Sequence, residues 1–158
     1  ARLKRAVRRR YPMQKAFDLQ TAPDWLQRLE REIQKFRATP NDRDAAINFF
    51  IAAESMLDWK HPGDGNASIR KTVRDSEPLL KVIWDLASVA KHREVRPNHD
   101  SVDDSGVIGE FFGAGFFGGS FFGALSVKLK GPAAAQFGAS VPAIELAERA
   151  VAYWKAHA

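Results

Sequence analysis

The sequence predicts a mainly α-helical fold, a bundle of four or five helices with a small β-hairpin inserted before the last helix. Long stretches carry apolar residues at three- and four-residue steps, and one short stretch at residues 125–130 alternates between apolar and polar. The chain has 158 residues, of which 45% are hydrophobic and 27% charged, and this suits one globular domain. We expect a basic N-terminal arm at residues 1–20 and a single helical domain at residues 21–158, with a Phe- and Gly-rich segment and the hairpin at residues 107–138.

The first predicted helix spans residues 21–38. Pro23 and Asp24 in its first turn favour a start here. Pro40 ends it, because the residue before a proline avoids helical geometry. Four apolar residues at helical spacing form the stripe expected to face the core: Trp25, Leu29, Ile33 and Phe36.

Asp42 can cap a second helix that runs to about Lys60. Its apolar residues cover a wide arc, so we place this helix at the centre of the bundle. Turn chemistry predicts a loop at residues 61–66, and a short helix is expected at residues 67–75.

A further helix is predicted to open with Ser76 as its cap and Pro78 in its first turn, and to continue to about His92. Its apolar residues recur at helical spacing, so one face should join the core. The polar residues 96–106 that follow are predicted to form an exposed loop.

Residues 107–127 raise the question of a membrane span. Phe-Phe-Gly occurs there three times at a five-residue step, and Gly115, Gly119 and Gly123 have the spacing that lets membrane helices pack closely. However, so many glycines make a poor helix in water, and Glu110 is costly in lipid. We therefore expect no membrane insertion, but a Phe-rich surface that packs on the bundle or on a partner and favours self-association.

The hairpin is expected to follow this segment. Residues 125–130 alternate and predict a strand, and Gly131-Pro132 predicts a turn. Residues 133–137 are the expected second strand.

The final helix is expected to start at Ser140 as its cap, with Pro142 in the first turn. Its predicted buried stripe consists of Ile144, Ala147, Val151 and Trp154.

The excess of positive charge lies in the N-terminal arm. Residues 1–10 hold six of the 24 Lys and Arg residues and none of the 19 acidic residues, so 18 basic and 19 acidic residues remain for the body. Such an arm predicts at most weak, salt-sensitive binding of nucleic acid. The arginines that would contact it are Arg5, Arg8, Arg9 and Arg10.

The chain contains no cysteine, which excludes disulfides, thiolate metal sites and a cysteine nucleophile. This composition fits a reducing compartment, and no apolar run follows the basic N-terminus as it would in a signal peptide. We therefore expect a cytoplasmic protein.

No cofactor and no metal are predicted. Phosphate-loop, dinucleotide and nucleophile-elbow motifs do not occur. Glu54, Asp58 and His61 could share one helix edge, and Asp85 and His92 lie on one face of another helix. A di-metal bundle needs more inward Glu and His residues than these, so ion pairs and helix caps are the expected role.

Arg93 and His99 form a possible catalytic pair. An Arg and a His separated by four to six residues on a helical bundle resemble HEPN-type ribonucleases, in which the Arg orients the scissile phosphate and the His transfers protons. RNA binding at this place is disfavoured by Pro97 and by the acidic residues after it, which would repel RNA. The structural alternative is a positive helix end that offsets the helix dipole.

Two of the predicted helices resemble those of a family of small bacterial helical proteins. Residues 45–59 end in Met-x-Asp-Trp and residues 85–92 end in Lys-His, and the Phe- and Gly-rich run, the strand and the last helix follow in the same order as in that family. The resemblance covers residues 42–157 and implies the same layout, but no biochemical activity. Ser55 stands where the family often has a histidine. The residues that match the family are Asp58, Trp59, Lys91 and His92.

These four residues have a structural and a functional interpretation. Asp58 at one helix end and Lys91-His92 at another can form a buried ion pair that fixes the packing of the two helices. Alternatively, they border a polar pocket floored by Trp59. We predict a non-catalytic, HEPN-like helical interaction module that forms a homo-oligomer or binds a protein partner. The first alternative is the metal-independent ribonuclease, and the second is a small-ligand or metal-binding bundle.

Overall fold

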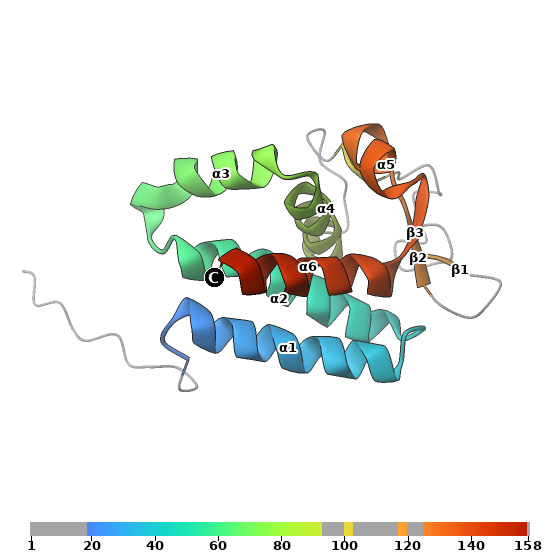
Figure 1. Ribbon diagram of the computed structural model, residues 1–158, viewed down its shortest axis with the longest axis horizontal. Coiled ribbons are helices and arrows are strands. Elements are labelled where there is room, and N and C mark those ends of the chain that lie inside the picture. The colour runs from blue at the N-terminus through green and yellow to red at the C-terminus, as the bar shows by residue number, and fades with distance from the viewer. Residues whose placement is uncertain (1–18, 93–99, 103–116, 120–124, 158) are drawn as a thin grey trace, which may run out of the picture.

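Six α-helices and a small antiparallel sheet make up the computed structural model, which describes residues 19–92, 100–102, 117–119 and 125–157 (Figure 1). The helices are α1 (Ala22–Ala38), α2 (Arg43–Lys60), α3 (Ala67–Ser76), α4 (Pro78–His92), α5 (Gly131–Phe137) and α6 (Ala143–His157), with a 3₁₀ turn, η2 (Asp64–Asn66), before α3. The strands are β1 (Phe117–Gly119), β2 (Leu125–Lys128) and β3 (Ser140–Pro142). The predicted fold class, mainly helical with a hairpin inserted before the last helix, is confirmed.

Figure 1 shows α1, α2 and α6 lying along the long axis of the molecule, with α4 nearly end-on and the sheet and α5 gathered at one end. Helix α2 packs against α1, α4 and α6, which confirms its predicted place at the centre. Apart from β1, the segment with the Phe-Phe-Gly repeats before β2 lies outside the described residues. In the part of the chain that the structure describes, no helix combines the length and hydropathy needed to cross a membrane.

Local signals start the first two helices where predicted. The Thr21 hydroxyl accepts a hydrogen bond from the N–H of Asp24 at 3.3 Å, and the Asp24 carboxylate accepts one from the N–H of Thr21 at 2.9 Å. The Asp42 carboxylate caps α2 by accepting from the N–H of Asp44 at 2.9 Å. These caps satisfy backbone donors that a helix start leaves without an intrahelical partner.

The core lies where the apolar faces of the long helices meet. Phe36, Phe49 and Phe50 are fully buried. The ring centroid of Phe36 lies 6.4 Å from that of Phe49 and 6.5 Å from that of Phe50, and the centroids of Phe49 and Phe50 lie 5.4 Å apart. Such distances are typical of tilted and edge-to-face aromatic contacts. Trp25, predicted on the buried stripe of the first helix, is only partly buried and packs at the rim of the core.

The predicted second strand of the hairpin is wrong, because residues 133–137 belong to helix α5. Pro132 suits a first helical turn, where its missing N–H has no intrahelical partner to lose, and the alanines that follow have the highest helix propensity. Strand β2 instead lies between two other strands: Val127 faces Phe117 on β1 and Val141 on β3.

The last helix starts later than predicted. Ser140 does not cap it, because Ser140–Pro142 form strand β3 and α6 begins at Ala143. Val141 is buried and pairs with Val127 on β2. This pairing of two β-branched residues outweighs the local preference of serine for a helix cap.

Residues 96–106 were predicted to form an exposed loop, and the structure describes residues 100–102 of them. The prediction is wrong for Ser101 and Val102, which follow the exposed Asp100. Ser101 and Val102 are only 4% and 3% exposed. The N–H of Ser101 donates to the carboxylate of Asp85 on α4 at 2.9 Å, and Val102 forms a bridge with the residue that follows β2. This short segment is therefore tied between α4 and the sheet.

Candidate functional site

Two tryptophans meet at one end of the α1–α2 pair. Trp25 lies in the first turn of α1 and Trp59 in the last turn of α2, and the two helices bring them together in a stack with ring centroids 5.0 Å apart and 16° between the planes. Both side chains are partly exposed. The indole N–H of Trp25 donates to the carbonyl of Ala52 at 2.8 Å, so this ring is held by a hydrogen bond as well as by stacking.

A cleft of about 290 Å³ opens beside this tryptophan pair. Arg28, one turn after Trp25 on α1, holds its guanidinium carbon 4.4 Å from the centre of the Trp25 ring, a cation–π contact. Helix α1 lines the cleft with Trp25, Arg28, Glu32 and Lys35, and α2 lines it with Asn48, Ile51, Ala52 and Ser55.

Most polar groups of the cleft already have partners. Lys35 pairs with Glu32 at 2.8 Å, and the Ser55 hydroxyl donates to the carbonyl of Ile51 at 2.9 Å. The Arg28 guanidinium makes no hydrogen bond or ion pair to another described residue. The groups of the cleft that have no partner among the described residues are therefore the Arg28 guanidinium and the exposed Asn48 amide, and the exposed Lys35 ammonium keeps donors beyond its bond to Glu32.

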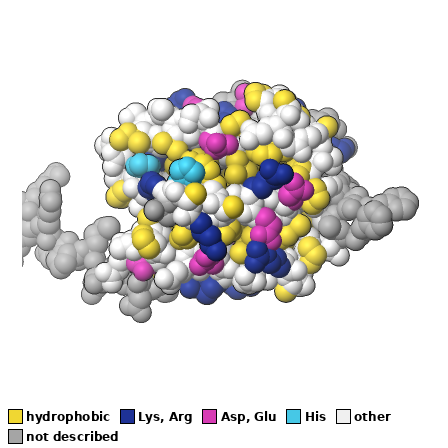
Figure 2. All heavy atoms as spheres, viewed as in Figure 1, with side chains coloured by type: hydrophobic (Ala, Val, Ile, Leu, Met, Phe, Trp, Pro, Cys, Tyr) yellow, Lys and Arg dark blue, Asp and Glu magenta, His cyan; other side chains and the backbone are white. Residues whose placement is uncertain are grey.

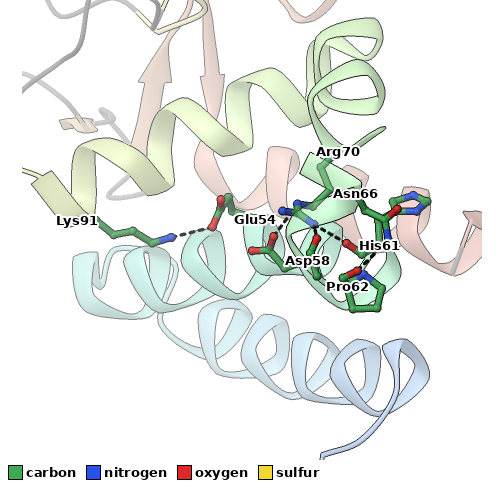
Figure 3. A network of polar contacts seen from close by, with 8 residues as sticks. Glu54, Asp58, His61, Pro62, Asn66, Arg70 and Lys91 are labelled. Carbon is green, nitrogen blue, oxygen red and sulfur yellow. Dashed lines mark hydrogen bonds and ion pairs between the residues drawn. The ribbon is translucent and has the colours of Figure 1, made fainter. Parts of the chain in front are cut away.

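The predicted ion pair between Asp58 and Lys91 is wrong in one partner. Lys91 at the end of α4 pairs with Glu54 at 2.7 Å, one turn before Asp58 on α2 (Figure 3). Asp58 is 63% exposed and pairs with Arg70 on α3 at 3.0 Å. An ion pair does link α2 to α4, but Asp58, one turn further along α2, pairs with α3 instead. His92 is the last residue of α4.

Arg70 fixes the connection between α2 and α3. Its guanidinium donates to the carbonyls of His61 and Gly63 at 2.5 and 2.8 Å while it pairs with Asp58 (Figure 3). The side chain is 19% exposed, and Gly63 has a positive φ of 87°, a conformation that glycine adopts readily. Through this ion pair Asp58 contributes to holding the loop in place.

We expect Arg70→Ala to lower the free energy of unfolding by about 1–2 kcal/mol, because two loop carbonyls and a carboxylate lose a charged donor. Urea denaturation followed by circular dichroism measures the effect. Lys71→Ala is the matched control, since the Lys71 side chain is 70% exposed in its pair with Asp75 and its loss should cost less than about 0.5 kcal/mol. Equal stability of the two variants would contradict the role assigned to Arg70.

A second cleft, of about 490 Å³, lies between α1 and α6 and is a weaker candidate. The Arg37 guanidinium donates two hydrogen bonds to the Glu148 carboxylate, both at 2.5 Å, which holds the pKa of Glu148 below and that of Arg37 above its usual range. Lys155 pairs with Glu30 at 2.7 Å. Figure 2 shows Lys and Arg side chains beside Asp and Glu side chains on this face of the molecule. Arg37 and Lys155 are therefore paired within the chain, which leaves the exposed Arg31 as the cation of this cleft without an ion pair to another described residue.

The other predicted site residues lie outside the part of the chain that the structure describes. These are Arg93 and His99 of the ribonuclease hypothesis and Arg5, Arg8, Arg9 and Arg10 of the basic arm. The HEPN-like assignment and nucleic-acid binding by the arm therefore stay predictions.

Potential metal ligands do not converge in the described part of the chain, where no group of three His, Asp or Glu side chains could hold a metal ion. Glu54 and Asp58, considered as possible ligands on one helix edge, are engaged by Lys91 and Arg70 instead.

The sequence pointed to Trp59 but not to Trp25 or Arg28 as parts of a site. A signal was present, because a Trp followed three residues later by an Arg on a helix places a cation over an aromatic ring. Comparison of the chain with protein-family models, curated proteins and solved structures finds no match.

Proposed function

We propose that this chain is a non-catalytic helical interaction module that binds a segment of a partner protein in the α1–α2 cleft. The observation that carries the proposal is the stack of Trp25 on Trp59, two large aromatic side chains that stay partly exposed beside a cleft. Tryptophan and arginine are the residues most enriched where protein interfaces gain their binding energy. Here both types lie side by side on two packed helices.

The surroundings of the cleft favour binding over chemistry. None of its eight lining residues is a histidine, the Ser55 hydroxyl is bonded to a backbone carbonyl, and Glu32 is paired with Lys35. These residues thus contain no nucleophile with an adjacent base. They do form a stable surface, since they stand on helices whose opposite faces reach the core.

We expect peptides selected from a random displayed library against the whole chain to bind in this cleft with micromolar affinity. Asn48→Trp fills the cleft from an exposed position on α2 and should weaken these peptides at least about tenfold. Gln34→Trp, an equally large substitution at an exposed position lining the α1–α6 cleft, is the matched control and should leave binding unchanged. Fluorescence anisotropy of labelled peptides measures both.

Failure to enrich any peptide, or equal binding by Asn48→Trp, would contradict the proposal. Sedimentation velocity adds a check on the partner, because a wild-type dimer that Asn48→Trp dissociates would make the partner a second copy of the chain. Labelled RNA incubated with the same preparation, with and without EDTA, should stay intact. Metal-independent cleavage that disappears in His99→Ala would replace the proposal with the ribonuclease alternative.

A further inference from the structure

We infer that the α1–α2 cleft binds a carboxylate, an Asp or Glu side chain of an acidic segment of the partner protein, on the guanidinium of Arg28. This inference rests on the proposed function and names the chemistry of the partner. It follows from the way Arg28 is held, from the donors left open around it, and from the charge of the cleft.

Arg28 is held in place before any ligand arrives. Its guanidinium lies over Trp25 at 4.4 Å, and Trp25 is itself held by the stack with Trp59 and by the hydrogen bond to the carbonyl of Ala52. A long side chain normally loses rotamer freedom when it binds a ligand. Stacking on a fixed ring removes part of that cost, because the planar guanidinium is already oriented.

The guanidinium lacks a carboxylate within the described chain. Glu32, one turn after Arg28 and therefore at a distance suited to an ion pair along the helix, pairs instead with Lys35 at 2.8 Å, and its side chain is only 14% exposed. Arginine presents its donors in a fixed fork that matches the two oxygens of a carboxylate. Arg28 thus presents this donor fork without an ion pair or hydrogen bond to any other described residue.

The charges of the cleft favour a single carboxylate over a nucleic acid. Arg28 and Lys35 carry the positive charges among the lining residues and Glu32 a negative one, which leaves one net positive charge. A chain of phosphates would bring several negative charges close to Glu32. Single-stranded nucleic acids also bind by stacking bases on open aromatic faces, whereas Trp25 already has a guanidinium and an indole ring against it.

Helix α2 completes the site for a peptide. The exposed Asn48 and the partly exposed Ser55 lie across the cleft from Arg28 and can hydrogen-bond to a peptide backbone, the amide with its donor and acceptor and the hydroxyl with its remaining acceptor capacity. The partly exposed Ile51 provides apolar contact between them. The cleft therefore combines one charged anchor with a mixed polar and apolar wall.

The test follows the arginine Nε–H resonances of the isotope-labelled full chain in NMR titrations. The probe is N-acetyl-glutamate N-methylamide, and its glutamine counterpart is the uncharged control. We expect the glutamate compound to shift the Arg28 resonance saturably, with a Kd of about 1–10 mM, and the glutamine compound to leave it unchanged. Arg28→Gln removes this resonance and thereby assigns it, and in Arg31→Gln, a change three residues along the same helix, the shift should persist.

Peptide binding to the wild type and to Arg28→Gln tests the same inference. Replacement of each acidic residue of the library-selected peptides by its amide should weaken binding to the wild type at least about tenfold and should have no effect on binding to Arg28→Gln. Absence of a saturable shift, an equal shift with the glutamine compound, or tighter binding of a single-stranded oligonucleotide at Arg28 would overturn the inference. If the selected peptides bind the cleft equally well after their acidic residues are replaced, the carboxylate inference is wrong and the proposed function stands. If the glutamate compound shifts the Arg28 resonance saturably but no peptide is selected, the carboxylate site stands and the proposed peptide-binding function is wrong.

Discussion

Phe36→Ala is expected to lower the free energy of unfolding by about 3–5 kcal/mol, among the largest effects of a single substitution in this protein. Phe36 is fully buried on α1, and its ring lies 6.4 Å from that of Phe49 and 6.5 Å from that of Phe50, both on α2. Truncation leaves a cavity between the two helices that the surrounding side chains fill only in part. The loss appears directly as a lower midpoint in urea denaturation at an unchanged slope.

Ile69→Ala is the control for this prediction. Ile69 on α3 is the large hydrophobic residue that stays 45% exposed, and its truncation should change stability by less than about 0.5 kcal/mol. Phe36→Leu should fall between the two variants, since leucine fills part of the space. A loss below about 1 kcal/mol in Phe36→Ala would show that α1 does not pack on α2 as described.

Asp85→Ala is expected to cost about 2–3 kcal/mol. Asp85 is fully buried on α4, and its carboxylate accepts the N–H of Ser101 at 2.9 Å. Without the carboxylate, this buried N–H loses its partner, and the segment that includes Val102 loses its tie to α4. Denaturant titration gives the global loss, and amide hydrogen exchange at Ser101 shows whether the segment detaches first.

Two variants separate this effect from a general loss of charge. Asp100→Ala removes a neighbouring carboxylate that is 72% exposed and lies 3.5 Å from Lys81, so it should cost less than about 1 kcal/mol. Asp85→Asn keeps an acceptor of similar shape and should retain more stability than Asp85→Ala. If hydrogen exchange at the Ser101 amide is unchanged in Asp85→Ala, loss of the hydrogen bond between Ser101 and Asp85 does not explain the lower stability.

The positions of the first two helices followed from local chemistry and could be predicted well. Thr21 and Asp42 cap α1 and α2 with their own side chains, and Pro40 lies just beyond the end of α1, so each boundary depends on residues a few positions apart. The central place of α2 was also predictable, because apolar residues around most of a helix require contacts on several sides.

The sheet could not be predicted in the same way. Val141 pairs with Val127 across a helix and a turn, and the sequence around Ser140 resembles a helix start equally well. Residues 133–137 show the converse, since their short apolar run suits a strand or a helix, and Pro132 with the alanines decides for the helix. Strand pairing depends on residues distant in the chain, so local patterns leave it open.

In the candidate site, too, the sequence indicated which residues matter locally but not which residues they contact. The pattern around Asp58 and Trp59 marked the end of α2 as notable, but not which neighbours these residues meet. The position at which α4 crosses α2 places Glu54, and not Asp58, opposite Lys91. The two carboxylates lie one turn apart along the same side of α2, and a sequence pattern does not specify the axial offset of two packed helices to that precision.

By itself the sequence determined the helical class, the ends of the first two helices and the central position of α2, because periodicity and capping act over one or two turns. Only the tertiary structure decided that Trp25 stacks on Trp59 and that Arg28, beside an open cleft, pairs with no carboxylate of the described residues. The physical reason is that these contacts join the start of one helix to the end of the next, and their geometry is set by the packing of the buried phenylalanines between α1 and α2.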